Sequence, residues 1–478
     1  MIGITAYGAY IPYHRLSRKA IAEATGETAL PGQRAVAGPD EDSVTMAVEA
    51  ARDALGGQRG DGLDAVYLAT TTAPYREKQA AATVAAALGV RPSVRAAAFS
   101  GSLQAGASAL LAAVDAVRAG SAGSVLVAVA DLRPAAPQGP LESIVGDGAA
   151  AFLVGSGPGV LATLEAAHSV TADLVGQWRG AQDPFVRSWE ERFVVSEGYG
   201  ALVREVLIGL RERTGLGPAD FARVILHPLH PRHHAALAAG LGFRPEQVQD
   251  PLFAAVGLAG AAAAPLMLAA ALAQARPGDR LLYVSYGDGA DALVFRVTEA
   301  ASQFRPRRGV AGWLEVGREG LTYMRYLRWR GLVPAEPGRR PARPRPSAPA
   351  LWRRRAKNLA LTGSRCTACG TPQFPPQRVC VHCQAVDHME PYRFADRPAR
   401  LVTFTADHLA AAVDPPTLLG AIDFEGGGRM LVELTDCMAN ELHVGMPVEM
   451  TFRRLYEAEG IQNYFWKARP VRTAGEGE

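Results

Sequence analysis

The sequence predicts an α/β protein: a duplicated five-layer αβαβα sandwich, followed by a small zinc ribbon and an all-β OB barrel. Three observations carry this prediction. One order of strands and small-residue helices occurs twice within residues 1–298. Four cysteines then form two CxxC pairs close together. Five short strand patterns follow those cysteines before the chain ends.

The duplicated unit consists of a buried strand, a small helix, a long helix and a second strand, and each copy closes with a Gly-Asp-Gly turn. The first copy has its strand at 64–70, its small helix at 80–88, its long helix from Phe99–Ser102 to about Ala119, and its second strand at 124–130. In the second copy the corresponding segments are 222–226, 234–241, a long helix opened by 256–260, and 280–285. Matching order and spacing indicate two halves related by a pseudo-twofold axis.

The two long helices are apolar nearly all round, which predicts burial between sheets rather than a place on the surface. Their N-terminal ends should then meet near the pseudo-axis. Helix N-termini favour negative charge, so this meeting point is the natural reaction site.

Composition narrows the possible functions. The 478 residues include 50 basic and 47 acidic side chains, a net charge of +3 that argues against a dedicated nucleic-acid binder. No cysteine occurs in the first 365 residues, so chemistry there cannot use a thiol from that part of the chain. We see no targeting segment, and glycines and Pro265 interrupt the longest uncharged run, Leu252 to Ala273. We therefore expect a cytoplasmic protein with no membrane partner.

Residues 1–300 resemble the thiolase superfamily, and within it the 3-hydroxy-3-methylglutaryl-CoA synthase and ketoacyl synthase III group. The resemblance rests on the duplicated unit and on the motifs that open its central helices and close its halves; these are Phe99 to Ala105, Leu226 to His230, Gly257-Leu258, Gly146-Asp147-Gly148 and Gly287-Asp288-Gly289. It implies an enzyme acting on an acyl-CoA thioester, and it implies a homodimer.

The resemblance also identifies positions where this chain differs from its relatives. In the superfamily a nucleophilic cysteine begins the first central helix; the matching position looks like Phe99, with Ser100 one residue off register. The synthase III histidine is kept as His227, but histidine and leucine stand at His230 and Leu258, where those enzymes carry asparagines. The glutamate of the hydroxymethylglutaryl-CoA synthases falls near Thr71.

Five side chains are therefore candidate catalytic residues: His227, His230, Ser100, Tyr286 and Tyr75. A neutral imidazole at His227 suits acid–base work near neutral pH. Ser100 is either an acyl acceptor or an ordinary helix cap. Backbone N–H groups around Gly101 and Ser102 could hold the thioester or enolate oxygen. His233 and His234 are expected to begin the next helix.

The cysteines Cys366, Cys369, Cys380 and Cys383 have the spacing of a structural zinc site that four thiolates close, without catalysis. The ribbon and the following barrel resemble accessory domains of thiolase-like enzymes, in which the small domain helps to enclose the CoA ester. OB folds also bind nucleic acids, but the low net charge and the fusion to a thiolase-like core argue against that partner here.

We expect domain boundaries at residues 1–165, 166–298, 299–360, 361–392 and 393–472, with a helix at 313–332 and an Arg/Pro-rich linker at 334–349. The expected function is aldol or retro-aldol chemistry on a 3-hydroxyacyl-CoA without a covalent enzyme thioester. Two alternatives stay open: a hydroxymethylglutaryl-CoA synthase-like acyltransferase using Ser100, and a non-catalytic acyl-CoA-binding scaffold. A partner acyl-CoA enzyme is also possible.

Overall fold

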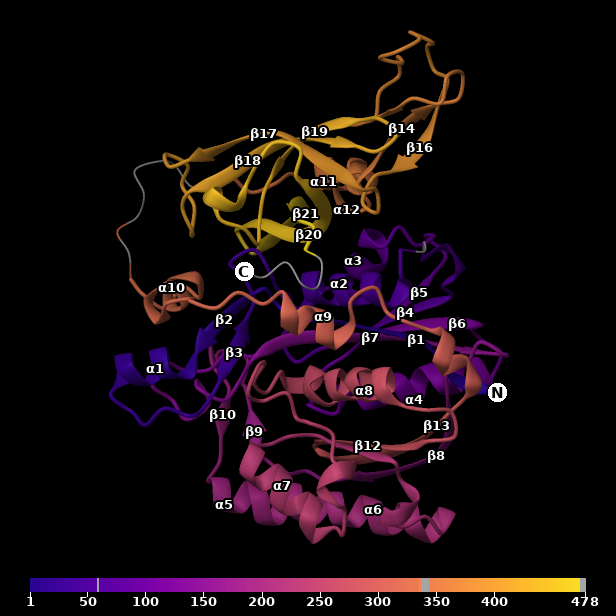
Figure 1. Ribbon diagram of the computed structural model, residues 1–478, viewed down its shortest axis with the longest axis vertical. Helices are drawn as coiled ribbons and strands as arrows, with labels where there is room; N and C mark the ends of the chain where they lie inside the picture. Colours follow the sequence, from indigo (N-terminus) through magenta and orange to yellow (C-terminus); the bar gives the residue numbers. More distant parts are fainter. Residues whose placement is uncertain (58–59, 335, 337–343, 473–478) are drawn as a thin grey trace.

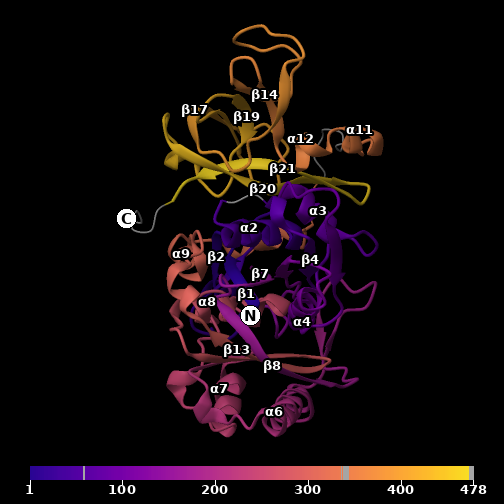
Figure 2. The same ribbon diagram turned by 90° about the vertical axis from the view of Figure 1, so that its right-hand side faces the viewer.

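The computed structural model describes residues 1–57, 60–334, 336 and 344–472. Within these ranges, nine strands are hydrogen-bonded in the order β11-β12-β13-β8-β1-β7-β6-β4-β5. Figures 1 and 2 show that this order folds into two layers, joined where β1 meets β8. Only two residue pairs make that joint, Gly3 with Thr163 and Ile4 with Ala162. A Cβ atom on Gly3 would lie 2.0 Å from the Ala162 carbonyl oxygen, so this close approach needs glycine.

Each layer of the sheet comes mainly from one half of the duplicated unit. The upper layer in Figure 1 contains β1 (Ile2–Tyr10), β4 (Ala65–Ala69), β5 (Arg95–Phe99), β6 (Ser124–Leu132) and β7 (Asp147–Ser156). The lower layer contains β8 (Ala162–Thr171), β11 (Arg223–Leu226), β12 (Arg280–Gly287) and β13 (Gly289–Val297). The repeat is visible in the pairing, because β4–β6 and β11–β12 are both parallel.

Helices complete the five layers. The outer layers are formed by α2 (Ser43–Leu55) with α3 (Ala80–Ala87), and by α6 (Ala201–Thr214) with α7 (Pro231–Gly240). Between the sheets lie α4 (Ala105–Arg118) and α8 (Ala263–Gln274). Ten successive residues of α8, from Ala263 to Leu272, are buried, which explains why that helix has no polar face. The predicted αβαβα architecture is confirmed.

Smaller elements surround the sandwich. Near the N-terminus β2 (His14–Ser17) pairs with β3 (Gln33–Val36) beside α1 (Arg18–Thr25). The short strands β9 (Gln177–Trp178) and β10 (Arg187–Ser188) lead to α5 (Glu191–Phe193). Instead of one helix at 313–332, the chain forms α9 (Gly309–Glu315) and α10 (Tyr323–Trp329). Gly320, at a φ of 90°, lies in the break between these two helices. Much of the expected linker, at 335 and 337–343, falls outside the described residues.

The C-terminal part contains the ribbon and the barrel. Helices α11 (Ala348–Arg353) and α12 (Arg355–Leu359) precede a three-stranded ribbon of β14 (Thr362–Cys366), β15 (Pro372–Gln373) and β16 (Met389–Arg393). The barrel strands are β17 (Ala399–Asp407), β18 (Thr417–Phe424), β19 (Arg429–Glu433), β20 (Pro447–Ala458) and β21 (Ile461–Pro470). A bridge between Leu434 and Ala468 joins the two edges of this sheet, as closure of an OB barrel requires.

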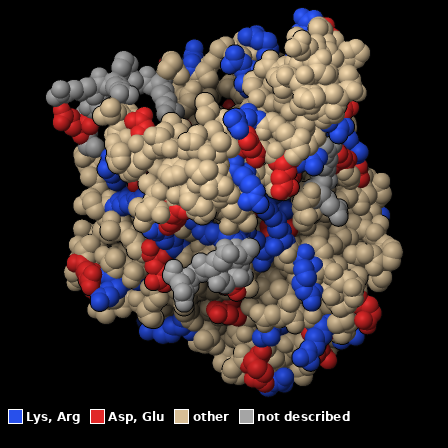
Figure 3. Space-filling model, turned by 45° about the horizontal axis from the view of Figure 1, so that its top comes forward, with Lys and Arg blue, Asp and Glu red and all other residues tan. Residues whose placement is uncertain are grey.

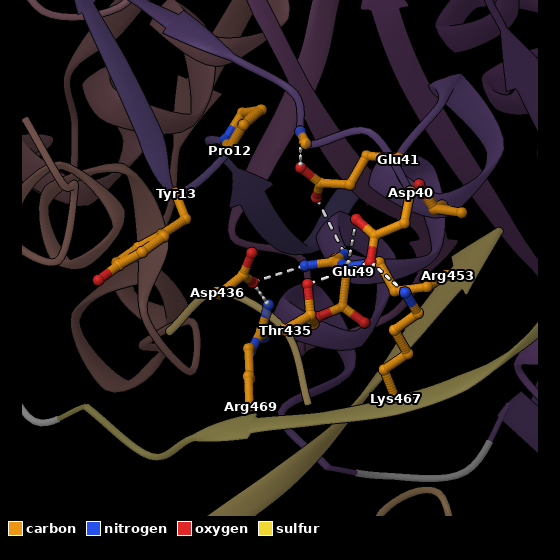
Figure 4. A network of polar contacts seen from close by, with 12 residues as sticks. Pro12, Tyr13, Asp40, Glu41, Glu49, Thr435, Asp436, Arg453, Lys467 and Arg469 are labelled. Carbon is orange, nitrogen blue, oxygen red and sulfur yellow. Dashed lines mark hydrogen bonds and ion pairs between the residues drawn. The ribbon is translucent and has the colours of Figure 1, made fainter. Parts of the chain in front are cut away.

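A buried charge network attaches the barrel to the sandwich through α2. Arg453 of β20 lies 2.6 Å from Asp436 and 2.9 Å from Glu41, and Arg469 of β21 lies 2.7 Å from Glu49 of α2 (Figure 4). Lys467 adds a 2.9 Å ion pair to Asp40. Because β20 packs against α2, and Arg469 of β21 and Gly309 of α9 donate hydrogen bonds to its Glu49 and Asp53, this outer-layer helix is almost entirely buried.

The face on which the barrel meets the sandwich carries both signs of charge. Figure 3 shows basic side chains gathered around a hollow in the middle of this face, with acidic side chains among them. A cavity of about 440 Å³ at this junction is lined by both kinds, among them Arg52, Arg307, Arg397, Asp396 and Glu449. No helix in the described part of the chain is both long and apolar enough to cross a membrane.

Candidate active site

The first central helix begins later than the sequence indicated. Strand β5 continues through Phe99, which pairs with Ala69, and a turn over residues 100–104 precedes α4. Gly101 has a φ of 91° in that turn. The prediction that Phe99–Ser102 opens the helix is therefore wrong. The Phe99 ring instead packs 5.4 Å from the ring of Tyr67. Leu103, two residues before α4 begins, lines two cavities that surround the start of this helix.

His227 lies directly after β11, and its backbone N–H donates to the Val284 carbonyl at 2.8 Å. The side chain is 3 % exposed, and its Nδ1 has no hydrogen-bond partner among the described residues. Burial lowers the pKa of His227 to about 3, and the positive charge of Arg133 acts in the same direction. The imidazole is therefore neutral over the physiological pH range.

A small cavity of about 30 Å³ brings His227 together with Leu103, Arg133 and Leu258. Leu258 reaches this place because its segment runs beside the one before Gly146 in a parallel bridge with Val145, where Leu258 N donates to the Ile144 carbonyl at 2.9 Å. A Cβ on Gly146 would lie 1.8 Å from the Val256 carbonyl oxygen, so only glycine permits this close approach. Neither a thiol nor a carboxylate is among the described residues that line this cavity.

A second cavity of about 140 Å³ adjoins the first and shares Leu103, Arg133 and Gln177 with it. Gly101, Ser102 and Tyr286 also line it, so three of the predicted site residues come together here. The ring of Tyr286 lies 6.5 Å from that of His227. Burial raises the pKa of the Tyr286 phenol to about 12, which keeps it protonated and able to donate a hydrogen bond.

A third cavity of about 620 Å³ shares Ile144, Gln177 and Leu229 with the small cavity. Its lining is mainly apolar and includes Trp178 and Trp189. His230 lines this cavity too, while its Nδ1 caps α7 by accepting from Arg232 N at 3.3 Å. This space is large enough for a cofactor-sized ligand.

The other histidines of the cluster lie on α7. His233 borders the third cavity and lies 2.6 Å from Glu191 through Nε2, and His234 is 2 % exposed. Both lie in the first turn of the helix, as expected from the sequence. Burial lowers the pKa of His230, and that of His234 to about 4.

Two predicted site residues lie elsewhere. Ser100 is exposed in the turn before α4, is not the N-cap of that helix, and lines none of the three cavities. The hydroxyl of Tyr75 accepts a hydrogen bond from Gln462 N of β21 at 2.8 Å, so Tyr75 connects the sandwich to the barrel. Neither the serine nor this tyrosine is placed with His227.

Sequence reasoning missed two polar residues near the end of β6: Asp131 is one of the last two residues of this strand, and Arg133 directly follows it. Asp131 is fully buried and accepts five hydrogen bonds of 2.7–3.0 Å; the donors are the hydroxyls of Thr70, Thr71 and Thr72 and the backbone N–H groups of Thr71 and Ala261. Arg133, 8 % exposed, donates to Thr71 Oγ1 and to Gln177 Oε1, each at 3.1 Å. Their position at the carboxyl end of a parallel strand was the available signal.

The ribbon cysteines form a second, separate site. The Sγ atoms of Cys366, Cys369, Cys380 and Cys383 all lie within 4.8 Å of one another. Two of the separations are 3.6 Å (Cys366–Cys383) and 3.5 Å (Cys369–Cys380). Zn–S bonds of about 2.3 Å in a tetrahedron require S···S edges of about 3.8 Å, so these four thiols fit a zinc ion.

Comparison with solved structures defines the class of protein first. The structure is similar to 3-oxoacyl-[acyl-carrier-protein] synthase III from Aquifex aeolicus, with a TM-score of 0.56 and 24 % identity over 62 % of this chain and 100 % of that one. A crystal structure of HMG-CoA synthase complexed with CoA gives a TM-score of 0.62 and 21 % identity, covering 68 % of this chain and 89 % of that one. The sandwich is a thiolase fold.

Sequence relatives then identify the family. Hydroxymethylglutaryl-CoA synthase of Methanopyrus kandleri is 34 % identical over 337 residues, covering 68 % of this chain and 95 % of that protein. The enzyme of Archaeoglobus fulgidus is 34 % identical over 348 residues, covering 70 % of this chain and all of that protein. The chain belongs to the hydroxymethylglutaryl-CoA synthase family.

Three segments also match family descriptions. Residues 211–297 match the 3-oxoacyl-[acyl-carrier-protein] synthase III C terminal. Residues 353–387 match the ChsH2 rubredoxin-like zinc ribbon domain, and residues 392–453 match the ChsH2 C-terminal OB-fold domain. The predicted resemblance to a thiolase-like domain fused to a ribbon and an OB barrel is confirmed.

Proposed function

We propose that this protein makes or breaks a C–C bond in an acyl-CoA thioester without a covalent enzyme intermediate, most simply as an aldolase acting on a 3-hydroxyacyl-CoA. One observation carries the proposal: at the start of α4 the neutral His227 shares a cavity with the hydrocarbon of Leu103, in a sandwich that contains no cysteine. Family membership and the 620 Å³ cavity support an acyl-CoA substrate.

In the cleavage direction, the His227 imidazole accepts the proton of the 3-hydroxyl group. The C2–C3 bond breaks, the C3–OH becomes a carbonyl, and the electron pair passes to the thioester as an enolate. Backbone N–H groups of the Gly101–Ser102 turn stabilise the enolate oxygen. The His227 imidazolium then returns its proton to C2, which completes the reaction and restores the neutral imidazole. Every step uses groups that line adjoining cavities.

The test is turnover of 3-hydroxyacyl-CoA and 3-oxoacyl-CoA esters, followed by mass spectrometry of the products and of the intact protein. Replacing a general acid–base typically costs about 10²–10⁴ in rate, so His227→Ala should lose at least 100-fold. His443→Ala, which removes an exposed histidine of the barrel, is the matched control and should keep full activity. Because the pKa of His227 is lowered to about 3, the pH profile of kcat/KM should show no limb near 6.5 from this residue.

Other outcomes would reject the proposal. An acyl adduct on the intact protein would indicate covalent acyl transfer. Bound ester without product or adduct would favour the acyl-CoA-binding scaffold.

We also propose a cytoplasmic homodimer, with a partner acyl-CoA enzyme possible. Four thiols held ready for zinc need a reducing compartment, which supports the cytoplasmic location. The expected role of the barrel, which is to help enclose the CoA ester, has less support. All residues that line the three cavities lie between Leu30 and Asp288, within the sandwich.

A further inference from the structure

Arg133 lies between the two cavities in which the proposed reaction takes place. It is buried, and it lines both the cavity of about 30 Å³ that contains His227 and the adjoining cavity of about 140 Å³. The smaller cavity has room for little more than one oxygen-sized group. A reacting group that enters beside His227 therefore also lies beside Arg133.

Two hydrogen bonds hold the guanidinium at the wall of the larger cavity. Its acceptors are Thr71 Oγ1 and Gln177 Oε1, each at 3.1 Å, and both residues line that cavity. Gly101 and Ser102, whose turn provides the backbone donors for the enolate oxygen in the proposed reaction, line it too. The guanidinium and the backbone donors therefore border one shared space.

The charge of Arg133 is not neutralised by contact with an acid. A guanidinium has five N–H donors, and its two acceptors in the described part of the chain are both neutral. Asp131 attracts Arg133, but the Thr71 hydroxyl lies between them, since it donates to Asp131 and accepts from Arg133. A buried cation that no anion contacts is costly to the folded protein.

We infer that Arg133 is a catalytic residue, whose guanidinium donates to the thioester oxygen and stabilises the enolate that forms when the C2–C3 bond breaks. This inference rests on the proposed function. The enolate charge is absent from the bound ester and develops in the transition state, so a fixed buried cation lowers the barrier rather than only tightening binding. Backbone N–H groups offer dipoles, whereas Arg133 offers a full positive charge.

The same charge links proton transfer to His227 with cleavage of the C–C bond. Arg133 contributes to the lowered pKa of the imidazole, so a proton on His227 is disfavoured while the ester is intact. Once the electron pair reaches the thioester, the enolate offsets the charge of Arg133, and the imidazolium is no longer opposed. Proton transfer from the 3-hydroxyl group and cleavage should therefore occur together.

Exchange of the C2 protons of acetyl-CoA in D₂O measures enolate formation alone. Acetyl-CoA has no 3-hydroxyl group to cleave, so deuterium enters only through the enolate that forms when His227 removes a C2 proton. The unmodified protein should catalyse this exchange, detected by mass spectrometry. Loss of one oxyanion donor typically costs about 10²–10³ in rate, so Arg133→Gln should exchange at least 100-fold more slowly, with the Kd for acetyl-CoA within about threefold. Its kcat for cleavage of a 3-hydroxyacyl-CoA should fall by the same factor.

Chemical rescue distinguishes a catalytic charge from a structural side chain. Arg133→Ala should recover exchange when guanidinium chloride is added at a non-denaturing concentration, because the free cation can occupy the space left. Urea, a neutral molecule of similar shape, should not rescue it. Arg133→Lys retains the charge without the planar fork and should keep an intermediate rate, which provides a reading if the other variants fold poorly.

A matched control uses an arginine away from the site. Arg192, an exposed residue of α5, lines none of the three cavities, so Arg192→Gln should exchange and cleave like the unmodified protein. Melting temperature and zinc content establish that each variant is folded.

Each contrary outcome has its own reading. Exchange that survives Arg133→Gln would overturn the inference and leave the proposed function standing. Equal rescue of Arg133→Ala by urea and guanidinium would also overturn it, since space rather than charge would then matter. Weaker binding of acetyl-CoA with an unchanged rate at saturation would assign Arg133 to binding instead of catalysis. Neither exchange nor cleavage by the unmodified protein would reject both proposals.

Discussion

Leu103 determines which chemistry is open to the site. A hydrocarbon side chain beside His227 provides no nucleophile to the small cavity. Burial is the largest cause of the lowered pKa of the imidazole, and the charges of Arg133 and His234 act in the same direction. The packing around the start of α4 therefore places a neutral histidine beside a side chain that cannot form an acyl-enzyme.

Placing a thiol at this position should allow the protein to accept an acyl group. In Leu103→Cys the sulfur would share the cavity of His227 and lie next to the N-terminus of α4, which favours the thiolate. Incubation with an acyl-CoA should add one acyl group, detected as a mass increase of the intact protein that hydroxylamine removes. The unmodified protein is the control, because it contains the same five native cysteines.

Two neighbouring variants decide whether the position matters. Phe99→Cys puts the thiol at the end of β5, and Ser100→Cys puts it in an exposed turn. Neither should be acylated by the CoA ester, although the exposed thiol should react with iodoacetamide. Acylation of either variant at the rate of Leu103→Cys would contradict the conclusion that Leu103, rather than Phe99 or Ser100, lies beside His227.

The wrong prediction that Phe99–Ser102 opens the first central helix has a physical explanation. Residues 95–99 are mostly alanine, a run that fits either a strand or a helix, and only pairing with β4 settles the choice. Burial and family resemblance sufficed to place His227. Arg133 was missed because its unpaired state depends on Thr71 and Gln177, which are 62 and 44 residues away in sequence. Local patterns report periodicity, whereas charge compensation is a property of the folded chain.

At the scale of an element, the ribbon should depend on zinc more than any other part of the chain. Its strands are short, and β15 contains two residues, so metal ligation supplies stability that burial cannot. We expect one zinc per chain by mass spectrometry of the metal. Cys380→Ser should lose it and become sensitive to proteolysis within 362–393, while the sandwich remains folded.

Cys437 provides a matched control for that loss. It is half-buried and lies outside the four-thiol cluster, so Cys437→Ser should keep the full zinc content. Full zinc in Cys380→Ser would show that the four thiols are not the ligand set.

For the whole molecule, the question is what joins the barrel to the sandwich. The ion pairs of Figure 4 connect α2 with β20 and β21, strands some 400 residues further along the chain. Removing one member of a buried pair leaves the other charge uncompensated, and such changes cost on the order of 3 kcal/mol. Exposed pairs such as Arg429 with Asp423 contribute much less.

Glu49 tests this joint through its pH dependence. Burial raises the pKa of its carboxyl, but Arg469 and Arg52 more than offset this and lower it to about 2. A carboxyl with a depressed pKa stabilises the fold above its unfolded value of about 4.5 and loses that effect as the pH falls toward 2. Glu49→Gln should therefore lower the melting temperature at pH 7, and the difference in melting temperature from the unmodified protein should close below pH 4.5.

Glu41 has a pKa raised to about 7 and contributes the opposite slope of stability against pH, but both proteins contain it, so their difference isolates Glu49. Asp423→Asn should leave the melting temperature nearly unchanged at every pH. A gap for Glu49→Gln that stays constant down to pH 3 would show that packing, rather than charge, joins the barrel to α2.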